Sequence, residues 1–327
     1  TTTSMMTHIL MEAGKDPTVM IGGTLPILGT GHRVGKGKTI ILESCEYCNS
    51  FLSFYPTLAV ILNIEADHLD FFKDLEDVEH AFRAFADLVP PGGTVLANGE
   101  DANTMKALEG KEGVLTFGLE KGTFHAENLT WDHGFPSFDV VWNGKPAVHV
   151  ALQVPGEHNV RNALAAVAVA VEVGVPEEKA VAAIRTYAPP AMRQQIKEAH
   201  GVTLIDDTYN ASPDSMRAAL KILGGLKATG KKYAVLADML ELGDYAERGH
   251  YETGAFAAEN GTDVLIGVGP LAKHIVEGFK NRENSVWFAS NAEAIAYLKD
   301  RLHPGDAVLC KGSRGMHMDE IIHALSE

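Results

Sequence analysis

The chain has 327 residues, of which 46% are hydrophobic, and a formal net charge of −15, and this length suggests two domains. The acidic charge argues against binding to nucleic acid or an anionic membrane, because phosphate binding needs clustered Lys and Arg. No apolar run approaches the ~20 residues that cross a bilayer, and residues 1–6 lack the layout of a signal peptide, so we predict a soluble, cytoplasmic protein and expect a monomer.

The first part of the chain alternates strand-like and helical patterns. Residues 4–13 and 75–88 predict helices, whereas residues 18–22, 38–43, 58–64, 94–97 and 114–117 predict strands. Three threonines are a poor start for a helix unless further residues precede them, so we expect a truncated N-terminus.

From residue 122 to residue 154 the pattern changes to alternation of apolar and polar residues. An Asn143-Gly144 turn in this region is a strong hairpin signal. The Ala/Val-rich helix that follows, up to about residue 173, must be buried. A second helix, residues 177–187, stops at Ala188-Pro189-Pro190, where we place the domain boundary.

The second half repeats the alternation, with strand patterns at residues 202–205, 233–237, 263–268, 285–289 and 306–310, each followed by a helical pattern. We therefore predict an α/β protein made of two doubly wound domains, residues 1–188 and 189–327. Polar groups follow three of the later strands: Asp206 with Asp207, Asp238 with Glu241, and Lys311 with Arg314. If the two domains face each other, acids would lie on one wall of a cleft and the basic pair on the other, a pattern typical of a metal beside a phosphorylated or carboxylate substrate.

Two strands of the first domain also end in groups that bind metals. Glu43 follows the run 39–42, and His68 follows the strand 58–64. On neighbouring strands these two side chains would share one edge of the sheet and could hold divalent cations. The alternative is that they are ordinary cap and turn residues.

Three cysteines, Cys45, Cys48 and Cys310, do not form a disulfide framework. Cys45 and Cys48 have the CxxC spacing of zinc and redox sites, but a structural zinc needs four ligands and no second CxxC exists. We therefore predict a reduced, partly buried pair.

Three motifs, at residues 43–52, 63–70 and 155–162, resemble the central ATPase domain of the Mur ligase family, most closely that of the member that adds L-alanine to UDP-N-acetylmuramate. Residues 206–213, 237–243 and 311–314 resemble the C-terminal domain of the member that adds D-alanyl-D-alanine to the tripeptide precursor. The resemblance implies a central ATP-binding domain followed by a Rossmann-like C-terminal domain.

The resemblance also implies roles for individual residues, with ATP and Mg²⁺ as cofactors. Glu43 and His68 would bind magnesium, and Arg193 would reach the phosphates. His158, Asn159 and Asn162 would contact adenine, or else cap the helix that follows. Asp207 would bind the ribose, and Lys311 or Arg314 would hold a substrate carboxylate.

The implied activity is an ADP-forming amide ligation through an acyl phosphate, on a UDP-N-acetylmuramoyl substrate. D-alanyl-D-alanine is the expected acceptor, because the C-terminal domain of these ligases supplies much of the acceptor pocket. L-alanine is the alternative, and Arg83 at the place of the carbamylated lysine of several members agrees with it. A further alternative is a non-catalytic remnant or hybrid, since the family's phosphate loop and N-terminal domain would precede Thr1.

Overall fold

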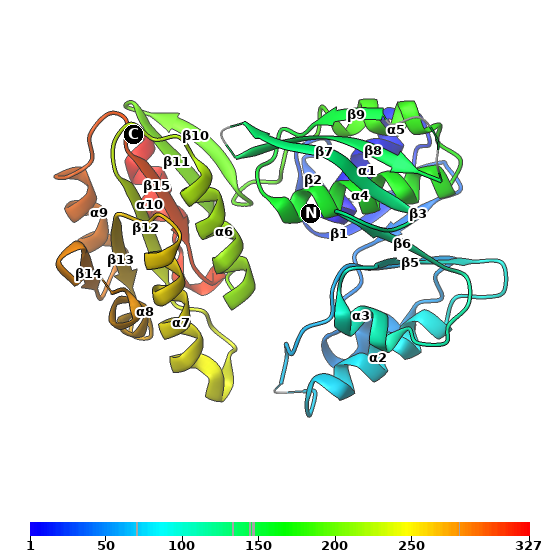
Figure 1. Cartoon of the computed structure of the whole chain (residues 1–327), viewed down its shortest axis with the longest axis horizontal. Helices are drawn as coiled ribbons and strands as arrows, with labels where there is room; N and C mark the ends of the chain where they lie inside the picture. The colour runs from blue at the N-terminus through cyan, green and yellow to red at the C-terminus, as the bar shows by residue number, and fades with distance from the viewer. Residues whose placement is uncertain (70, 133, 144, 146–147, 281) are drawn as a thin grey trace. The chain divides into compact units, whose positions relative to one another are not determined.

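The computed structural model describes residues 1–327 except Asp70, His133, Gly144, Pro146, Ala147 and Asn281. The chain divides into two compact units, Thr1–Pro190 and Ala191–Glu327. Both are built from sheets with helices on their faces (Figure 1). In the described part of the chain, no helix combines the length and the apolar character needed to cross a membrane.

The main sheet of the first unit has six strands in the order β4-β5-β6-β7-β8-β9. The first four strands pair in parallel and the last three in antiparallel fashion, so the hairpin pattern predicted within residues 122–154 is confirmed as an antiparallel extension of the sheet. Of the predicted Asn143-Gly144 turn, Gly144 lies outside the described residues. The strands are β4 (Leu58–Ile61), β5 (Thr94–Asn98), β6 (Val114–Gly118), β7 (Phe124–Asp132), β8 (Phe135–Trp142) and β9 (Val148–Ala151).

Helices cover both faces of this sheet because alternate residues of its strands point to opposite sides. Val95 and Ala97 pack in the cluster with α2 and α3, whereas Leu96 packs in the cluster with α1, α4 and α5. Nearly all of the middle of α4 is buried, as its Ala/Val-rich sequence predicts. The helices are α1 (Thr2–Glu12), α2 (Leu75–Asp87), α3 (Ala102–Ala107), α4 (Glu157–Glu172) and α5 (Glu177–Ile184).

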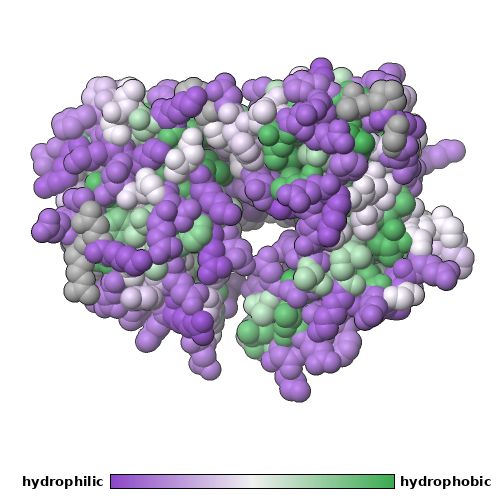
Figure 2. Space-filling view, viewed as in Figure 1, coloured by the Kyte–Doolittle hydropathy of each residue, from purple (hydrophilic) through white to green (hydrophobic). Residues whose placement is uncertain are grey.

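A separate three-stranded sheet has the order β2-β1-β3, with β1 (Thr18–Leu25), β2 (Thr30–Arg33) and β3 (Ile40–Leu42). β1 pairs with β3 in parallel and with β2 in antiparallel fashion. The outer face of this sheet carries exposed apolar side chains, including Met20 and Ile40. Elsewhere too, hydrophobic patches interrupt the mostly hydrophilic surface of the chain (Figure 2).

The second unit has one six-stranded sheet in the order β10-β11-β15-β12-β13-β14, parallel except for the edge strand β10. One face packs against α6, α7 and α8, and the other against α9 and α10, so the unit is doubly wound. The strands are β10 (Gln195–Ala199), β11 (Val202–Asp207), β12 (Lys232–Ala237), β13 (Val264–Val268), β14 (Ser285–Phe288) and β15 (Ala307–Lys311). The helices are α6 (Pro213–Gly225), α7 (Ala246–Glu259), α8 (Ala272–Gly278), α9 (Asn291–Lys299) and α10 (Asp319–Ser326).

The predicted α/β class is confirmed, and the unit boundary lies two residues beyond the predicted one. The edge strands β2 and β10 were not predicted from the sequence. Each is polar, and each is joined to its antiparallel partner through left-handed backbone, at Gly29 before β2 and at His200 with Gly201 after β10. Such edge strands carry little apolar periodicity, which is the signal that predicts strands.

Candidate active site

The loop after β4 carries His68 and is fixed near its start. Asp101 caps α3 by accepting from Thr104 N at 2.8 Å, and the same oxygen accepts from Ile64 N at 3.2 Å. The side-chain amide of Asn103 donates to Ile64 O at 2.8 Å. The loop backbone is thus bonded on both its N–H and its C=O to the start of α3, so one helix cap also positions the His68 segment.

His68 itself has a left-handed backbone and a half-buried side chain. Its Nε2 atom lies 3.5 Å from Glu46 Oε1, and its ring lies 4.8 Å from the ring of Tyr47, measured between centroids. Glu46 and Tyr47 were not singled out from the sequence as site residues. The signal that could have found Glu46 is its place three residues after Glu43 in the same strand-end motif, because a second carboxylate there adds an oxygen ligand.

Glu43 follows β3 and is exposed. Its Oε2 atom accepts a hydrogen bond from Gly22 N at 2.7 Å, which ties the end of β3 to β1. The prediction that Glu43 and His68 follow neighbouring strands of one sheet is wrong, because β3 belongs to the three-stranded sheet and β4 to the six-stranded sheet. Short apolar runs predict strands but do not encode which strands pair, and this is why the prediction failed.

The prediction of a partly buried Cys45 and Cys48 is also wrong. Both thiols are free and exposed, whereas Cys310 is free and buried. Cys48 and the next residue, Asn49, both have left-handed backbone within the 3₁₀ segment Tyr47–Ser53. Cys48 lies within this irregular segment and Cys45 lies two residues before it, and neither belongs to the core cluster that contains Phe51.

The side-chain donor atoms of the first unit indicate how it could bind a divalent cation. Among the described residues, no group of three His, Cys, Asp or Glu side chains could enclose a metal ion. Mg²⁺ does not require such a group, since it commonly binds one or two carboxylates together with waters and phosphate oxygens. The exposed carboxylate of Glu43 fits that mode of binding.

The first turns of α4 hold a chain of amide hydrogen bonds. The side-chain nitrogen of Asn159 donates to Pro155 O at 2.7 Å, Asn162 donates to Asn159 Oδ1 at 3.1 Å, and Thr2 donates to Asn162 Oδ1 at 2.8 Å. The alternative that these residues cap the helix is wrong, because the N-cap is Gly156 and no side chain caps it. Asn159 is buried, and His158 is half-buried.

In the second unit, Asp207 and Lys311 form a buried ion pair. They are register partners at the carboxyl ends of the parallel strands β11 and β15. Lys311 Nζ lies 2.7 Å from Asp207 Oδ2 and donates to Asn210 O at 2.8 Å. The two side chains are only 3% and 7% exposed, so the charges of these two predicted site residues neutralise each other.

Two arginines lie in or contact the segments that follow these two strands. Arg314 is about half exposed and lies 3.4 Å from Asp319 Oδ1. The guanidinium of Arg193 lies 3.8 Å from the centroid of the Tyr209 ring, an arrangement that contributes roughly 0.5–1 kcal/mol at exposed sites. Tyr209 was not predicted as a site residue, but it lies in the motif that follows β11.

The loop after β12 is fixed by two buried groups. Asp238 accepts from Ala272 N at 2.7 Å. His250 accepts from Met239 N at 2.8 Å through Nε2, and its Nδ1 donates to Ala246 O at 2.6 Å. Burial lowers the pKa of His250 below its ordinary value. The imidazole is therefore neutral, and both ring nitrogens are used to hold the loop.

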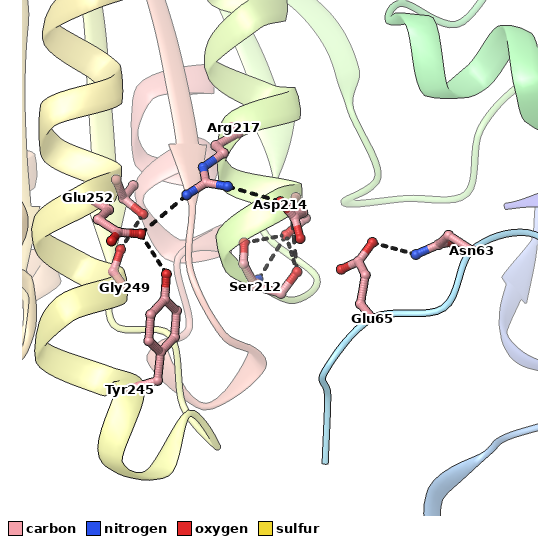
Figure 3. A network of polar contacts seen from close by, with 10 residues as sticks. Asn63, Glu65, Ser212, Asp214, Arg217, Tyr245, Gly249 and Glu252 are labelled. Atoms are coloured by element: carbon pink, nitrogen blue, oxygen red, sulfur yellow. Dashed lines mark hydrogen bonds and ion pairs between the residues drawn. The ribbon is translucent and has the colours of Figure 1, made fainter. Parts of the chain in front are cut away.

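A polar network joins α6 to α7 beside this loop. Arg217 contacts both Asp214, at 3.3 Å, and Glu252, at 3.4 Å (Figure 3). Tyr245 donates to Glu252 Oε2 at 2.6 Å, and Arg248 donates to the other carboxylate oxygen at 2.8 Å. Tyr245 and Arg248 together hold the pKa of Glu252 below its usual value, so this carboxylate stays ionised.

Comparisons with known proteins agree with the two-unit architecture. The family model of the Mur ligase middle domain matches residues 1–170, and that of the Mur ligase glutamate ligase domain matches residues 192–314. The UDP-N-acetylmuramate–L-alanine ligase of Caldanaerobacter subterraneus subsp. tengcongensis is 36% identical over 97% of this chain and 71% of its own length.

Two solved structures resemble the chain over almost its whole length. MurF from Acinetobacter baumannii has a TM-score of 0.85 and 27% identity, and the match covers 99% of this chain and 73% of that one. The UDP-N-acetylmuramate-alanine ligase MurC from Thermotoga maritima has a TM-score of 0.79 and 25% identity, and the match covers 99% of this chain and 70% of that one.

Proposed function

Because the chain belongs to the Mur ligase family, we propose that it catalyses ATP-dependent amide-bond formation in peptidoglycan precursor synthesis. The observation that carries this proposal is the match of both family domains, in family order, over residues 1–170 and 192–314. Such a reaction needs ATP, so we place the protein in the cytoplasm.

The proposed reaction has two steps. A carboxylate oxygen of the UDP-N-acetylmuramoyl substrate attacks the γ-phosphorus of ATP, the bond to the β-phosphate oxygen breaks, and ADP leaves. The amine of the acceptor then attacks the carbonyl carbon of the acyl phosphate, phosphate leaves, and the amine loses a proton. When bound, Mg²⁺ neutralises negative charge on the phosphate oxygens.

Each side chain has a proposed part in binding or orientation. Glu43 would bind the cation and His68 would orient the phosphates or a second cation, in keeping with their places after β3 and β4. His158, at the start of α4, would contact the adenine. Arg193 would bind phosphate oxygens, because its planar guanidinium matches two oxygens at once.

Arg314 is the proposed partner of a substrate carboxylate in the second unit. Lys311 shares that role in the sequence-based prediction, but it is paired with Asp207 and nearly fully buried, whereas the side chain of Arg314 is 54% exposed. An exposed cation can exchange its weak contact with Asp319 for a substrate carboxylate at little cost. We therefore assign carboxylate binding to Arg314 alone, and a purely structural role to Lys311 and Asp207.

For the acceptor, we propose L-alanine first. The relative that is 36% identical over 97% of this chain is a UDP-N-acetylmuramate–L-alanine ligase, and this identity exceeds that of the MurF structure. D-alanyl-D-alanine is the second candidate. It is favoured by the higher TM-score of MurF and by the motifs at residues 206–213 and 311–314.

The test measures phosphate release from ATP and Mg²⁺ by the 327-residue chain. One reaction contains UDP-N-acetylmuramate with L-alanine, and the other contains the tripeptide precursor with D-alanyl-D-alanine. Release that needs L-alanine supports the first assignment, and release that needs D-alanyl-D-alanine supports the second. A folded chain that binds ATP but releases no phosphate with either pair contradicts the ligase proposal and supports a non-catalytic remnant.

A further inference from the structure

A serine, a histidine and an aspartate form a hydrogen-bonded series on the antiparallel extension of the first unit. Ser137 Oγ lies 3.0 Å from His149 Nε2, and His149 Nδ1 lies 2.7 Å from Asp139 Oδ1. The other oxygen of Asp139 accepts from the side-chain amide of Asn128 at 2.8 Å. These atoms are the ones used when a histidine activates a serine hydroxyl and an aspartate orients the histidine.

The sheet brings these side chains together on one face. Asp139 of β8 and His149 of β9 are direct cross-strand partners, and Ser137 lies two residues from Asp139 on the same side of β8. The residues between them, Phe138 and Val150, point into the core. The series therefore lies on the face of β8 and β9 that is turned away from the core.

The hydrogen bonds also determine the tautomer of the neutral imidazole. An ionised Asp139 can only accept, so His149 Nδ1 carries the proton and Nε2 is left as the acceptor for the Ser137 hydroxyl. The side chains of Asn128 and His149 hold the pKa of Asp139 below its usual value, which keeps this carboxylate ionised. Arg185 donates to the backbone oxygen of His149 and fixes the edge strand there.

We propose that Ser137 is a nucleophile activated by His149 as general base, with Asp139 as a positioning residue, and that this site transfers acyl groups from small activated esters. The Ser137 oxygen attacks the ester carbonyl and its proton passes to His149 Nε2. The alcohol leaves with that proton, and water then hydrolyses the acyl-serine by the same route. This activity is separate from the proposed ligation.

The exposure of the site sets its substrate class. The side chain of His149 is 61% exposed, so reagents reach it directly from solvent. The site must therefore rely on the leaving group of the reagent rather than on substrate binding. Phenyl esters and fluorophosphonates, which carry good leaving groups, are the matching class.

The experiment labels the folded chain with a fluorophosphonate probe and maps the modified serine by peptide mass spectrometry. Ser137 should be labelled, and His149→Gln should lower its rate of labelling about 100-fold, a typical contribution of a general base. Glutamine can still hydrogen-bond to both neighbours, but it cannot take the proton. A merely structural histidine would therefore leave the rate unchanged in this variant.

The matched control is Ser50→Ala, since Ser50 is exposed but donates to the backbone oxygen of Tyr47 at 2.7 Å. This variant should keep both the labelling of Ser137 and the hydrolysis of p-nitrophenyl acetate, whereas Ser137→Ala should lose both. Labelling spread evenly over the serines, or equal rates for the parent chain and His149→Gln with the same thermal midpoint, would overturn the proposal.

Discussion

The buried pair of Asp207 and Lys311 gives a quantitative prediction for Lys311→Met. Methionine fills much of the same space but leaves the Asp207 carboxylate, 7% exposed, without a counter-charge, and leaves Asn210 O without its donor. Removing one partner of a buried pair costs about 3–5 kcal/mol. Because a domain is stable by only about 5–15 kcal/mol, this single change should remove roughly a fifth or more of the free energy of unfolding of the second unit.

The assay is urea unfolding followed by circular dichroism, with hydrogen exchange of peptides from β11 and β15 to assign the transition to the second unit. Arg314→Met is the control, because its exposed contact with Asp319 is worth about 0–1 kcal/mol. Adding Asp207→Asn to Lys311→Met should recover part of the loss, since no charge then stays buried. If Lys311→Met costs no more than Arg314→Met, or if the double variant is less stable than the single one, the reasoning is refuted.

Three further predictions concern pH, a helix cap and metal binding. Burial lowers the pKa of His250 in the folded chain, so the unfolded chain takes up a proton on this imidazole at a higher pH than the folded chain does. As the pH falls below about 6.5, the free energy of unfolding should therefore fall by up to ~1.4 kcal/mol per pH unit. Urea unfolding of the parent chain and of His250→Ala between pH 5 and 7.5 tests this, and an equal dependence of stability on pH in both contradicts it. Asp101→Ala removes the cap of α3 and the partner of Ile64 N, and should cost about 1 kcal/mol and speed hydrogen exchange of residues 62–69. Glu43→Gln should raise the Mg²⁺ concentration for half-maximal phosphate release by on the order of tenfold, whereas the exposed Glu76→Gln should not.

The fold was largely predictable because many strands of the two six-stranded sheets are short and apolar. The runs that became β5, β12 and β15 are buried on both faces of a sheet, and such runs have an unambiguous pattern. Asp207 and Lys311 were both expected after strands, but on opposite walls of a cleft, so the sequence analysis did not predict that they pair on neighbouring strands of one sheet. Their mutual neutralisation was not predictable, because it depends on which strands are neighbours.

The remaining site features depend on contacts distant in sequence. The neighbours of His68 were not predictable from periodicity, because Glu46 and Tyr47 lie in an irregular segment with left-handed residues. The separation of β3 from β4 is a matter of strand order, which hydrophobic patterns do not specify. The series of Ser137 and His149 requires the register of β8 and β9, and a shift of one residue would place these two side chains on opposite faces.

The packing of α1 against the end of the first unit has a consequence for synthesis on the ribosome. His8 of α1 contacts Ala183 O and Thr186 Oγ1, both at 3.0 Å, across as many as 178 residues of sequence. At translation rates of about 5–20 residues per second, Thr186 is made roughly 10–35 s after His8. The apolar side of the helix, with Met5 and Ile9 fully buried in the folded unit, cannot complete its packing against α4 and α5 before then. The nascent chain thus presents a hydrophobic segment to chaperones until translation passes the end of α5.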